Sequence, residues 1–256
     1  MDAFFLDFWF PFLLIFARII AFIGVLPFFG WRGVPVLLRV FVSFVLSILL
    51  TLNWEGQLAL PVNDLASILL FAREFLIGLL LGFLVYLYLS IFLMAGQFMD
   101  HKAGLMMAGM FDPLFGGQVT ILGQFFYMFA VVLFLTVNGH HILFFSLLDS
   151  LKVIPLAGSF PPAPVFQEYI KHFYAVFLLA FQIATPVVIV LWLLDIALGF
   201  ISKTVPQIHV FIVGLPLKIA FVLLVFILMC PFLGGVMNDL FDQIARDFIV
   251  LMRRLV

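Results

Sequence analysis

Residues 65–93 read LASILLFAREFLIGLLLGFLVYLYLSIFL, a run of apolar residues long enough to cross a membrane as one helix. Such a helix needs about 20 mostly apolar residues, and a helix satisfies its own backbone hydrogen bonds where no water is present. The rest of the chain has a similar character. Of its 256 residues, 66% are hydrophobic and 10% are charged, whereas about a quarter are charged in soluble domains. The sequence therefore predicts an all-α, membrane-associated protein.

Six apolar stretches have lengths suited to spanning helices. They cover residues 4–26, 36–52, 65–93, 119–137, 174–200 and 210–233. A seventh stretch, residues 142–154, is too short to span and ends at Pro155, so we expect a re-entrant or packed helix there. In the tail, residues 238–256, apolar residues recur at helical spacing opposite charged ones, which predicts an amphipathic helix. The apolar positions are Leu240, Phe241, Ile244, Phe248, Leu251 and Met252.

Charge and cysteine content exclude several classes of protein. The formal net charge of −1 gives no basic stripe of the kind that binds nucleic acid. The single cysteine, Cys230, allows no intrachain disulfide and lies in an apolar run, so we interpret it as a small buried hydrophobe. Asp2 and Asp7 stand where a secretory signal peptide carries basic residues, so we expect the first apolar stretch to remain on the mature protein.

The sequence gives no positive sign of an enzyme or of a cofactor. It contains no nucleophile elbow, Walker loop, dinucleotide fingerprint or zinc-protease motif. His140 and His141 are adjacent and therefore point in different directions on a helix, with no third ligand nearby, so we predict no metal site. Asp195 could indicate an intramembrane aspartyl protease, but we find no second aspartate at comparable depth. We expect Asp195 to be an interhelical hydrogen-bond partner and no residue to be catalytic.

Three further ionisable residues lie inside apolar stretches, where they usually face a bundle interior or water. They are Arg18, Arg73 and Glu74. Glu74, Gly78 and Gly82 follow one another at steps of four, which places a carboxylate and two glycines on one helical face. This face predicts close approach of a neighbouring helix. The alternative is that Arg73 and Glu74 begin the helix and are solvated.

The positive-inside rule gives a conflicting topology. Arg32, Lys102 and Lys203 would place three alternate loops in the cytoplasm. Other basic residues then fall on the wrong side, namely Lys152, Lys171, Arg246, Arg253 and Arg254. Either the count of six spans is wrong or some apolar helices are buried in a protein assembly. We expect the loop that follows Lys203 to be cytoplasmic.

Residues 96–117, GQFMDHKAGLMMAGMFDPLFGG, combine glycine, methionine, phenylalanine and a short charged cluster. Five of the ten methionines fall in or beside this segment. Methionine repacks easily and glycine frees the backbone, so the segment is typical of a deformable seal. An ordinary apolar loop that covers helix ends would have a similar composition, and that alternative stays open.

Five blocks of sequence, in order along nearly the whole chain, resemble the FliR family, the flagellar members of the export-gate T component of type III secretion systems. The blocks are FARIIAFIGVLPFFGWRGVP (16–35), REFLIGLLLGF (73–83), AGQFMDHKAGLMMAGMFDP (95–113), LFLTVNGHH (133–141) and PQIHVFIVGLPLK (206–218). The resemblance implies a non-enzymatic pore subunit of the flagellar export gate. Such a subunit lies in the bacterial inner membrane within the flagellar basal body and conducts unfolded flagellar proteins.

The resemblance also implies an architecture and partners. It implies a FliP-like helical part over residues 1–165 and a FliQ-like helical hairpin with an amphipathic tail over 166–256, divided near the proline-rich SFPPAP (159–164). FliP-like and FliQ-like subunits would surround the chain, with FlhB-like and FlhA-like components beside them. Much of this assembly would stand out of the membrane plane.

A pore plug is the site that the resemblance implies, and it falls on residues 106–119. The plug residues are Met106, Met107, Met110, Phe111, Asp112, Pro113, Phe115, Gly116 and Gly117. The residues expected to pack helices or contact partners are Arg18, Glu74, Gly78, Gly82, Asp195 and Lys203.

Other functions remain possible on sequence alone. A secondary transporter would have two halves of similar hydropathy and broken helices around a midplane site, and the six stretches do not divide that way. An injectisome export-gate subunit would differ from a flagellar one in its host machine. An intramembrane hydrolase would depend on Asp195.

Overall fold

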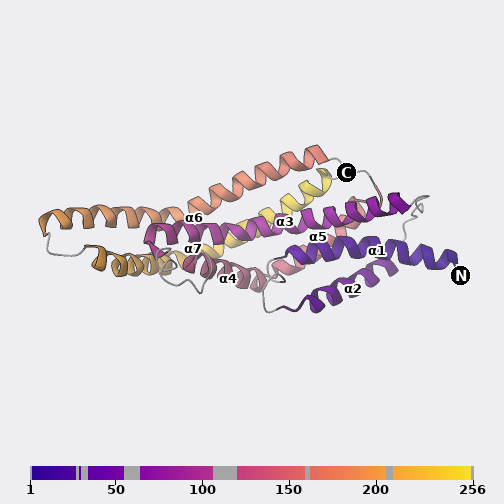
Figure 1. The fold of residues 1–256 in the computed structure, drawn as a ribbon, viewed down its shortest axis with the longest axis horizontal. Helices are drawn as coiled ribbons and strands as arrows, with labels where there is room; N and C mark the ends of the chain where they lie inside the picture. The colour runs from indigo at the N-terminus through magenta and orange to yellow at the C-terminus, as the bar shows by residue number, and fades with distance from the viewer. Residues whose placement is uncertain are drawn as a thin grey trace. The chain divides into compact units, whose positions relative to one another are not determined.

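The computed structural model describes residues 2–26, 29, 34–54, 64–105, 120–158, 162–205 and 210–254. These residues form helices, without a strand among them, which confirms the all-α prediction (Figure 1). The helices are α1 (Asp2–Val25), α2 (Val36–Leu52), α3 (Asp64–Ala103), α4 (Ile121–Thr136), α5 (Gly139–Val153), α6 (Pro162–Thr204) and α7 (Val210–Arg254).

The chain forms two compact units. Unit 1 comprises Met1–Tyr88, Asn138–His172 and Phe241–Val256, and unit 2 comprises Leu89–Val137 and Phe173–Leu240. Helices α3, α6 and α7 therefore contribute residues to both units. The division of the chain near residue 165 into FliP-like and FliQ-like parts concerns likeness to other proteins, and it stays a prediction.

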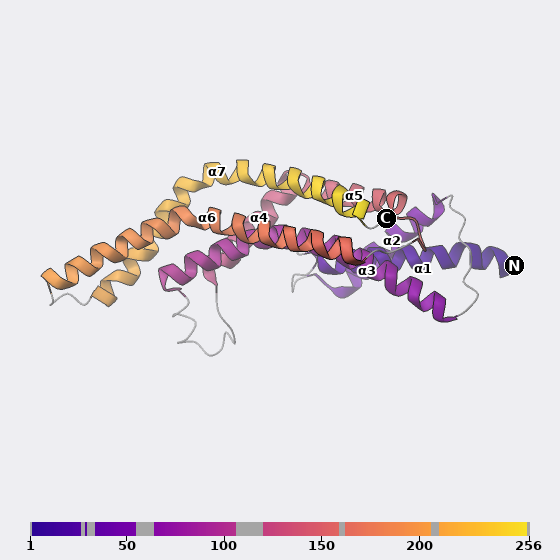
Figure 2. The same cartoon turned by 90° about the horizontal axis from the view of Figure 1, so that it is seen from above.

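Unit 1 is built on α1 and α2, which lie side by side (Figure 2). Their aromatic rings interlock, because Phe12 stacks on Phe16 with ring centroids 6.0 Å apart and meets Phe44 of α2 edge-on at 5.5 Å. The end of α7 closes this core, where Phe248 packs edge-on against Phe22 of α1. Burial of large rings in such edge-on pairs stabilises a core beyond their area alone.

The amphipathic helix predicted for the tail is confirmed. All six of its predicted apolar residues, from Leu240 to Met252, are buried. The tail continues the preceding apolar helix, because α7 runs without interruption from Val210 to Arg254. Its glycine pair, Gly234 and Gly235, lies within the helix, where backbone hydrogen bonds continue through both residues.

The expectation of six spanning helices is too high for the part of the chain that the structure describes. Four helices, α1, α3, α6 and α7, are long and apolar enough to cross a membrane, and α2 with its 17 residues is shorter. Helices α4 and α5 pass only as a pair, bent by 72° between them, which gives at most five spans. The bend suits the packed or re-entrant helix expected after residue 141.

A single residue accounts for the break between α4 and α5. Asn138 adopts a left-handed conformation with φ 59°, which asparagine tolerates better than most residues. Gly139 follows and begins α5. The dipeptide Asn138–Gly139 therefore turns the chain without a long loop.

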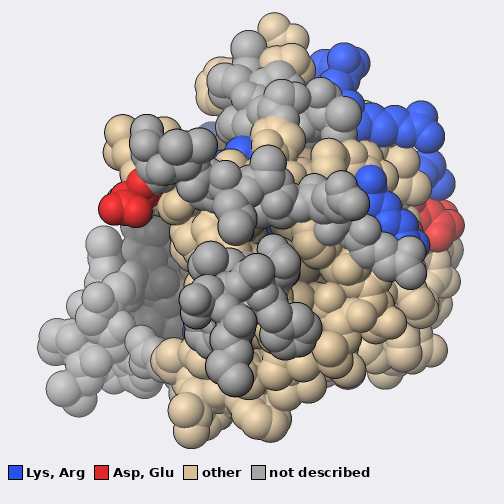
Figure 3. Space-filling model, turned by 90° about the vertical axis from the view of Figure 1, so that its right-hand side faces the viewer, with Lys and Arg blue, Asp and Glu red and all other residues tan. Residues whose placement is uncertain are grey.

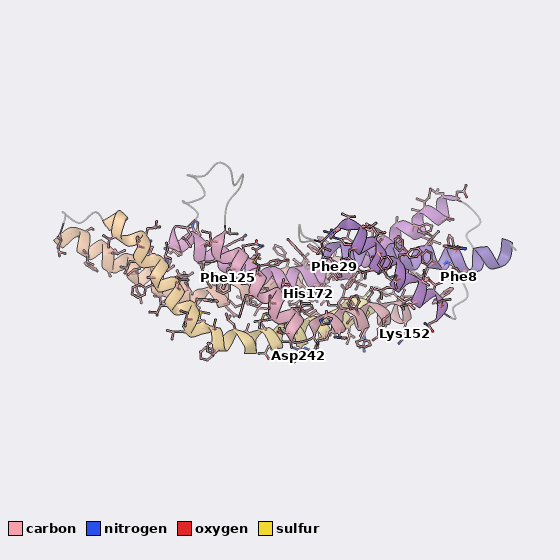
Figure 4. The ribbon with its side chains drawn as sticks, turned by 90° about the horizontal axis from the view of Figure 1, so that it is seen from below. Phe8, Phe29, Phe125, Lys152, His172 and Asp242 are labelled. Atoms are coloured by element: carbon pink, nitrogen blue, oxygen red, sulfur yellow. The ribbon has the colours of Figure 1, made fainter. Side chains whose placement is uncertain are left out.

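Unit 2 contains a hairpin formed by the end of α6 and the start of α7, which run next to each other in both views (Figures 1 and 2). Phe98 of α3 packs edge-on against Phe177 and Phe181 of α6. Phe125 of α4, labelled in Figure 4, packs edge-on against Phe226 of α7 at 5.4 Å. Aromatic contacts in this unit thus join α3 to α6 and α4 to α7.

Much of the described surface is apolar. On the face drawn in Figure 3, lysine and arginine side chains gather mostly at the upper right, and most of the other described residues there are uncharged. Large exposed side chains include Phe41, Phe166, Trp192, Phe200 and Phe232. Soluble monomers rarely expose so much apolar surface, which favours contact with lipid or with other subunits.

Candidate functional site

The predicted plug residues, Met106 to Gly117, lie outside the described residues. The structure does describe the two ends from which residues 106–119 extend, at Leu105 and Thr120. The candidate site is therefore the base of the plug segment, where α3 ends and α4 begins in unit 2.

Asp100, in the last turns of α3, joins these two helices. Its Oδ1 accepts a hydrogen bond from the backbone N–H of Leu122 and its Oδ2 one from Gly123, each at 3.1 Å. These N–H groups belong to the first turn of α4, where a helix leaves donors without an internal partner. Thr120, the N-cap residue of α4, makes no side-chain cap bond. The fully buried Asp100 carboxylate therefore caps α4 from another helix.

A glycine contact brings the same two helices together at backbone level. A Cβ atom built on Gly96 of α3 would overlap the backbone of Gly123 in α4. A Cβ on Gly123 would lie 3.1 Å from the carbonyl oxygen of Leu93. Only glycine at position 96 allows this approach, because any side chain there would push the helices apart. We call Asp100, Gly96, Leu122 and Gly123 the α3–α4 clasp.

Gly104 ends α3 just before the plug segment. It adopts φ +78°, a conformation in which glycine carries no steric penalty, and its N–H donates to the carbonyl of His101 at 3.3 Å. A Cβ on Gly104 would lie 3.4 Å from Leu215 of α7. The chain therefore leaves α3 through a glycine turn that packs against α7.

A cluster of charges links three helices of unit 2 close to this turn. Asp195 of α6 lies 2.5 Å from the Nζ atom of Lys218 in α7 and 3.7 Å from that of Lys102 in α3. Lys102 also lies over the ring of Trp192, 5.2 Å from its centroid. A cation above an indole face in a partly dry site is stabilised electrostatically. Asp195 thus makes contacts between helices through ion pairs.

The structure corrects one step of the sequence interpretation. Asp100 is a second aspartate within an apolar helix, and it is more deeply buried than Asp195. Its two oxygens are occupied by the N–H groups of α4, whereas Asp195 pairs with lysines. Neither arrangement is that of two facing aspartates that share a water.

The predicted packing residues of the N-terminal part meet in unit 1. The Arg18 guanidinium of α1 donates to Glu74 of α3 through Nε at 2.7 Å and Nη2 at 2.5 Å. It also donates to the backbone carbonyls of Ser150 and Ile154 at the end of α5, at 3.0 and 3.1 Å. Both charged side chains are fully buried, so Glu74 is not solvated as the alternative interpretation supposed. One arginine therefore joins three helices.

Gly78 and Gly82 lie on the same face of α3 and allow this contact. A Cβ on Gly78 would overlap the backbone carbonyl of Arg18, and one on Gly82 would lie 2.8 Å from that of Phe22. The neighbouring helix is α1 of the same chain. Lys203, in contrast, is exposed in the last turn of α6 and joins neither cluster.

Comparison with known proteins identifies the relationship. The sequence pattern of the family described as "Bacterial export proteins, family 1" matches residues 9–244. The chain belongs to this family. It is 37% identical to the flagellar biosynthetic protein FliR of Bacillus subtilis (strain 168) over 94% of this chain and 95% of the relative. The FliR proteins of Aquifex aeolicus (strain VF5) and Escherichia coli (strain K12) are 29% and 28% identical, over 92% and 89% of this chain and 91% and 87% of theirs.

Membership of the bacterial export protein family, together with the apolar helices, makes the chain a multi-pass inner-membrane component of flagellar export. The family is one of export-apparatus components, which favours a non-enzymatic role. Among the residues that the structure describes, no three histidine, cysteine, aspartate or glutamate side chains converge as metal ligands would.

The sequence interpretation missed two polar groups in this bacterial export protein. One is Asp100, which the sequence shows only as part of the short charged cluster in residues 96–117. The other is a cluster in unit 1, where the Tyr88 hydroxyl donates to Asp247 and His172 Nδ1 lies 3.5 Å from the same carboxylate. His172 is labelled on α6 in Figure 4. The sequence signals for this second cluster were a tyrosine in YLYLSIFL and an aspartate on the polar face of the tail.

Proposed function

We propose that this chain is a core pore subunit of the flagellar type III export gate, which conducts unfolded flagellar proteins across the inner membrane. Residues 106–119 form its plug. The observation that carries the proposal is the α3–α4 clasp, because it fixes both ends of the methionine- and glycine-rich segment to one base. A deformable closure on a rigid base suits a pore that must hold back ions and still pass a polypeptide.

The lengths of the helices support an assembly that extends beyond the bilayer. Helix α3 has 40 residues, α6 has 43 and α7 has 45. At a rise of about 1.5 Å per residue each is about 60 Å long, roughly twice the hydrocarbon thickness of about 30 Å. A helix of this length leaves the membrane or lies against other subunits. The same property accounts for the conflicting pattern of basic residues.

The exposed aromatic side chains support the proposal that other protein subunits surround the chain. Phe173 and Tyr174 are exposed neighbours on α6 in unit 2, Phe232 is exposed on α7 in the same unit, and Phe166 is exposed on the part of α6 that belongs to unit 1. Lipid contact alone is served equally well by leucine and valine, whereas large aromatic rings are enriched at protein interfaces. We propose FliP-like and FliQ-like subunits as these partners, with FlhB-like and FlhA-like components and exported polypeptides as further contacts.

We propose that the two parts of the chain have different roles. Residues 1–165 act as the FliP-like part that includes the plug, and residues 166–256 act as the FliQ-like hairpin and tail. Asp195, bound to Lys102 and Lys218, ties the hairpin to the helix that leads into the plug segment.

Affinity purification from native membranes tests the assignment. The tagged chain, solubilised in mild detergent, should retain FliP-like and FliQ-like subunits at fixed ratios, and mass spectrometry would identify them. A tagged, unrelated multi-pass protein from the same membranes serves as the control. Recovery of the chain as a stable species without these subunits would contradict the proposed pore assembly.

A further inference from the structure

We propose that Asp100 is a positioning residue that keeps α3 and α4 joined throughout protein export, so that the gate conducts without separation of these two helices. The inference rests on the proposed function, since it names the part of the pore subunit that stays fixed. It concerns the α3–α4 clasp alone, which lies wholly within the described residues of unit 2.

The chemistry of the clasp makes it costly to open. Both oxygens of the Asp100 carboxylate are satisfied by backbone N–H groups, and the side chain is fully buried. Hydrogen bonds to an ionised group are stronger than neutral ones, and the start of α4 carries a partial positive charge. Separation of the helices would leave a buried carboxylate without partners and expose two backbone donors to an apolar environment.

The glycine contact adds a geometric reason. Gly96 and Gly123 meet backbone to backbone, so a small displacement opens a gap that no side chain can fill. A gap narrower than a water molecule loses the packing contacts and is too small to admit water in their place. A contact of this kind is therefore either fully made or lost. The clasp therefore has one favourable arrangement, whereas the Gly104 turn beyond it is conformationally permissive.

A cross-link across the clasp tests whether the helices separate. Gln97 and Gln124 are exposed and directly follow the two contacting glycines. Because the glycine backbones touch, the Cα atoms of Gln97 and Gln124 lie within about 12 Å of each other, which a flexible bismaleimide spans. The variant Gln97→Cys/Gln124→Cys, made in a Cys230→Ala background to remove the native thiol, would be cross-linked in cells that assemble the gate.

After cross-linking, the rate at which the gate exports flagellar proteins should stay within about twofold of the rate of the untreated gate. This difference is small compared with the roughly tenfold change expected from the loss of one charge-assisted hydrogen bond. Gln97→Cys alone, treated in the same way, controls for modification. Arrest of export by the cross-link, with the single-cysteine control still active, would show that α3 and α4 must separate and would overturn the proposal.

A second variant separates positioning from folding. Asp100→Asn keeps the size of the side chain, but one backbone N–H of α4 then faces an amide NH₂ group. We expect roughly a tenfold rise in ion leak through assembled gates, the factor that loss of one charge-assisted hydrogen bond predicts. The same cross-link should return the leak of the Asp100→Asn variant to the parental level. A defect of folding would not respond to a cross-link applied after assembly.

Glu74→Gln serves as the matched control, because it also neutralises a fully buried carboxylate but in unit 1. It should lower the amount of assembled gate without a leak from the gates that form. A leak of Asp100→Asn equal to that of the parent, or one that persists after cross-linking, would overturn the proposal. A gate that lacks residues 110–116 tests the plug itself: if that gate stays tight, the proposed function fails whatever the clasp does.

Discussion

Removal of the Arg18 guanidinium should destabilise the protein more than any substitution of an exposed charge. In Arg18→Met, Glu74 loses two hydrogen bonds at 2.7 and 2.5 Å, and the carbonyls of Ser150 and Ile154 each lose the bond from Arg18, although Ser150 keeps the one from the N–H of Ile154. Arg73 remains 3.6 Å from Glu74 and offsets part of the loss. Breaking a buried ion pair by removal of one partner costs about 3–5 kcal/mol, because the other charge stays buried.

The loss is measured as the apparent melting temperature of the gate purified with its partners. For chains of about this length, 1 kcal/mol corresponds to roughly 2–4 °C, so we expect a decrease on the order of 10 °C. Lys152→Ala is the control, since Lys152 and Asp149 pair at 3.1 Å on the surface with side chains 80% and 57% exposed. An exposed pair of this kind contributes about 0–1 kcal/mol, so its loss should shift the melting temperature by only a few degrees.

The double variant Arg18→Met/Glu74→Met tests whether the unpaired Glu74 carboxylate causes the loss of stability. It removes both charges and leaves apolar side chains of similar length, so it should be more stable than Arg18→Met alone. Equal destabilisation by Arg18→Met and Lys152→Ala would refute the claim that the buried pair holds α1 to α3. A double variant less stable than Arg18→Met would refute the claim that the unpaired Glu74 carboxylate causes the loss.

Four further predictions follow from the packing. The isolated chain should aggregate in mild detergent and give one defined complex only when co-expressed with its partners, as size-exclusion chromatography would show; a stable, monodisperse monomer would contradict the need for partners. Gly78→Leu should block assembly but not membrane insertion, because the new side chain would displace α1. Gly199→Leu is the control, since no atom lies within 4 Å of a Cβ at that position, and it should assemble normally in a pull-down. Ser202→Cys, in the last turn of α6, should react with a membrane-impermeant maleimide only after the cells are opened, since we expect the following loop to be cytoplasmic; labelling in intact cells refutes this. Tyr88→Phe should destabilise the complex by about 1–3 kcal/mol in thermal unfolding, because it removes the hydroxyl that donates to the Asp247 carboxylate of α7. Tyr86→Phe, at an exposed position, should have little effect. Equal effects of the two variants would exclude a role for the hydrogen bond between Tyr88 and Asp247.

The sequence predicted those features that depend on one helix at a time. Steps of four from Glu74 through Gly78 to Gly82 revealed a packing face, because helical periodicity is a local property. The helix class followed from long apolar runs, and the tail's buried stripe followed from spacing alone. The continuity of that tail with the rest of α7 was not predicted, because a change in composition does not show whether the backbone hydrogen bonds break there.

Features that depend on two distant segments could not be predicted. Asp100 binds backbone N–H groups 22 and 23 residues away, and a backbone donor leaves no mark in the sequence. Asp195 was found as a lone carboxylate, but its partners Lys102 and Lys218 lie on other helices. Tyr88 and Asp247 are 159 residues apart, and only the folded chain brings them together.

The central claim is that residues 106–119 close the pore, and the most direct measurement is ion leak through gates that lack residues 110–116. The deletion lies within the plug segment and leaves the α3–α4 clasp intact, so assembly should be preserved and is checked by co-purification of the partner subunits. The account predicts a leak of ions or small solutes well above the parental level in cells that assemble the shortened gate. An assembled gate that remains as tight as the parent would contradict it.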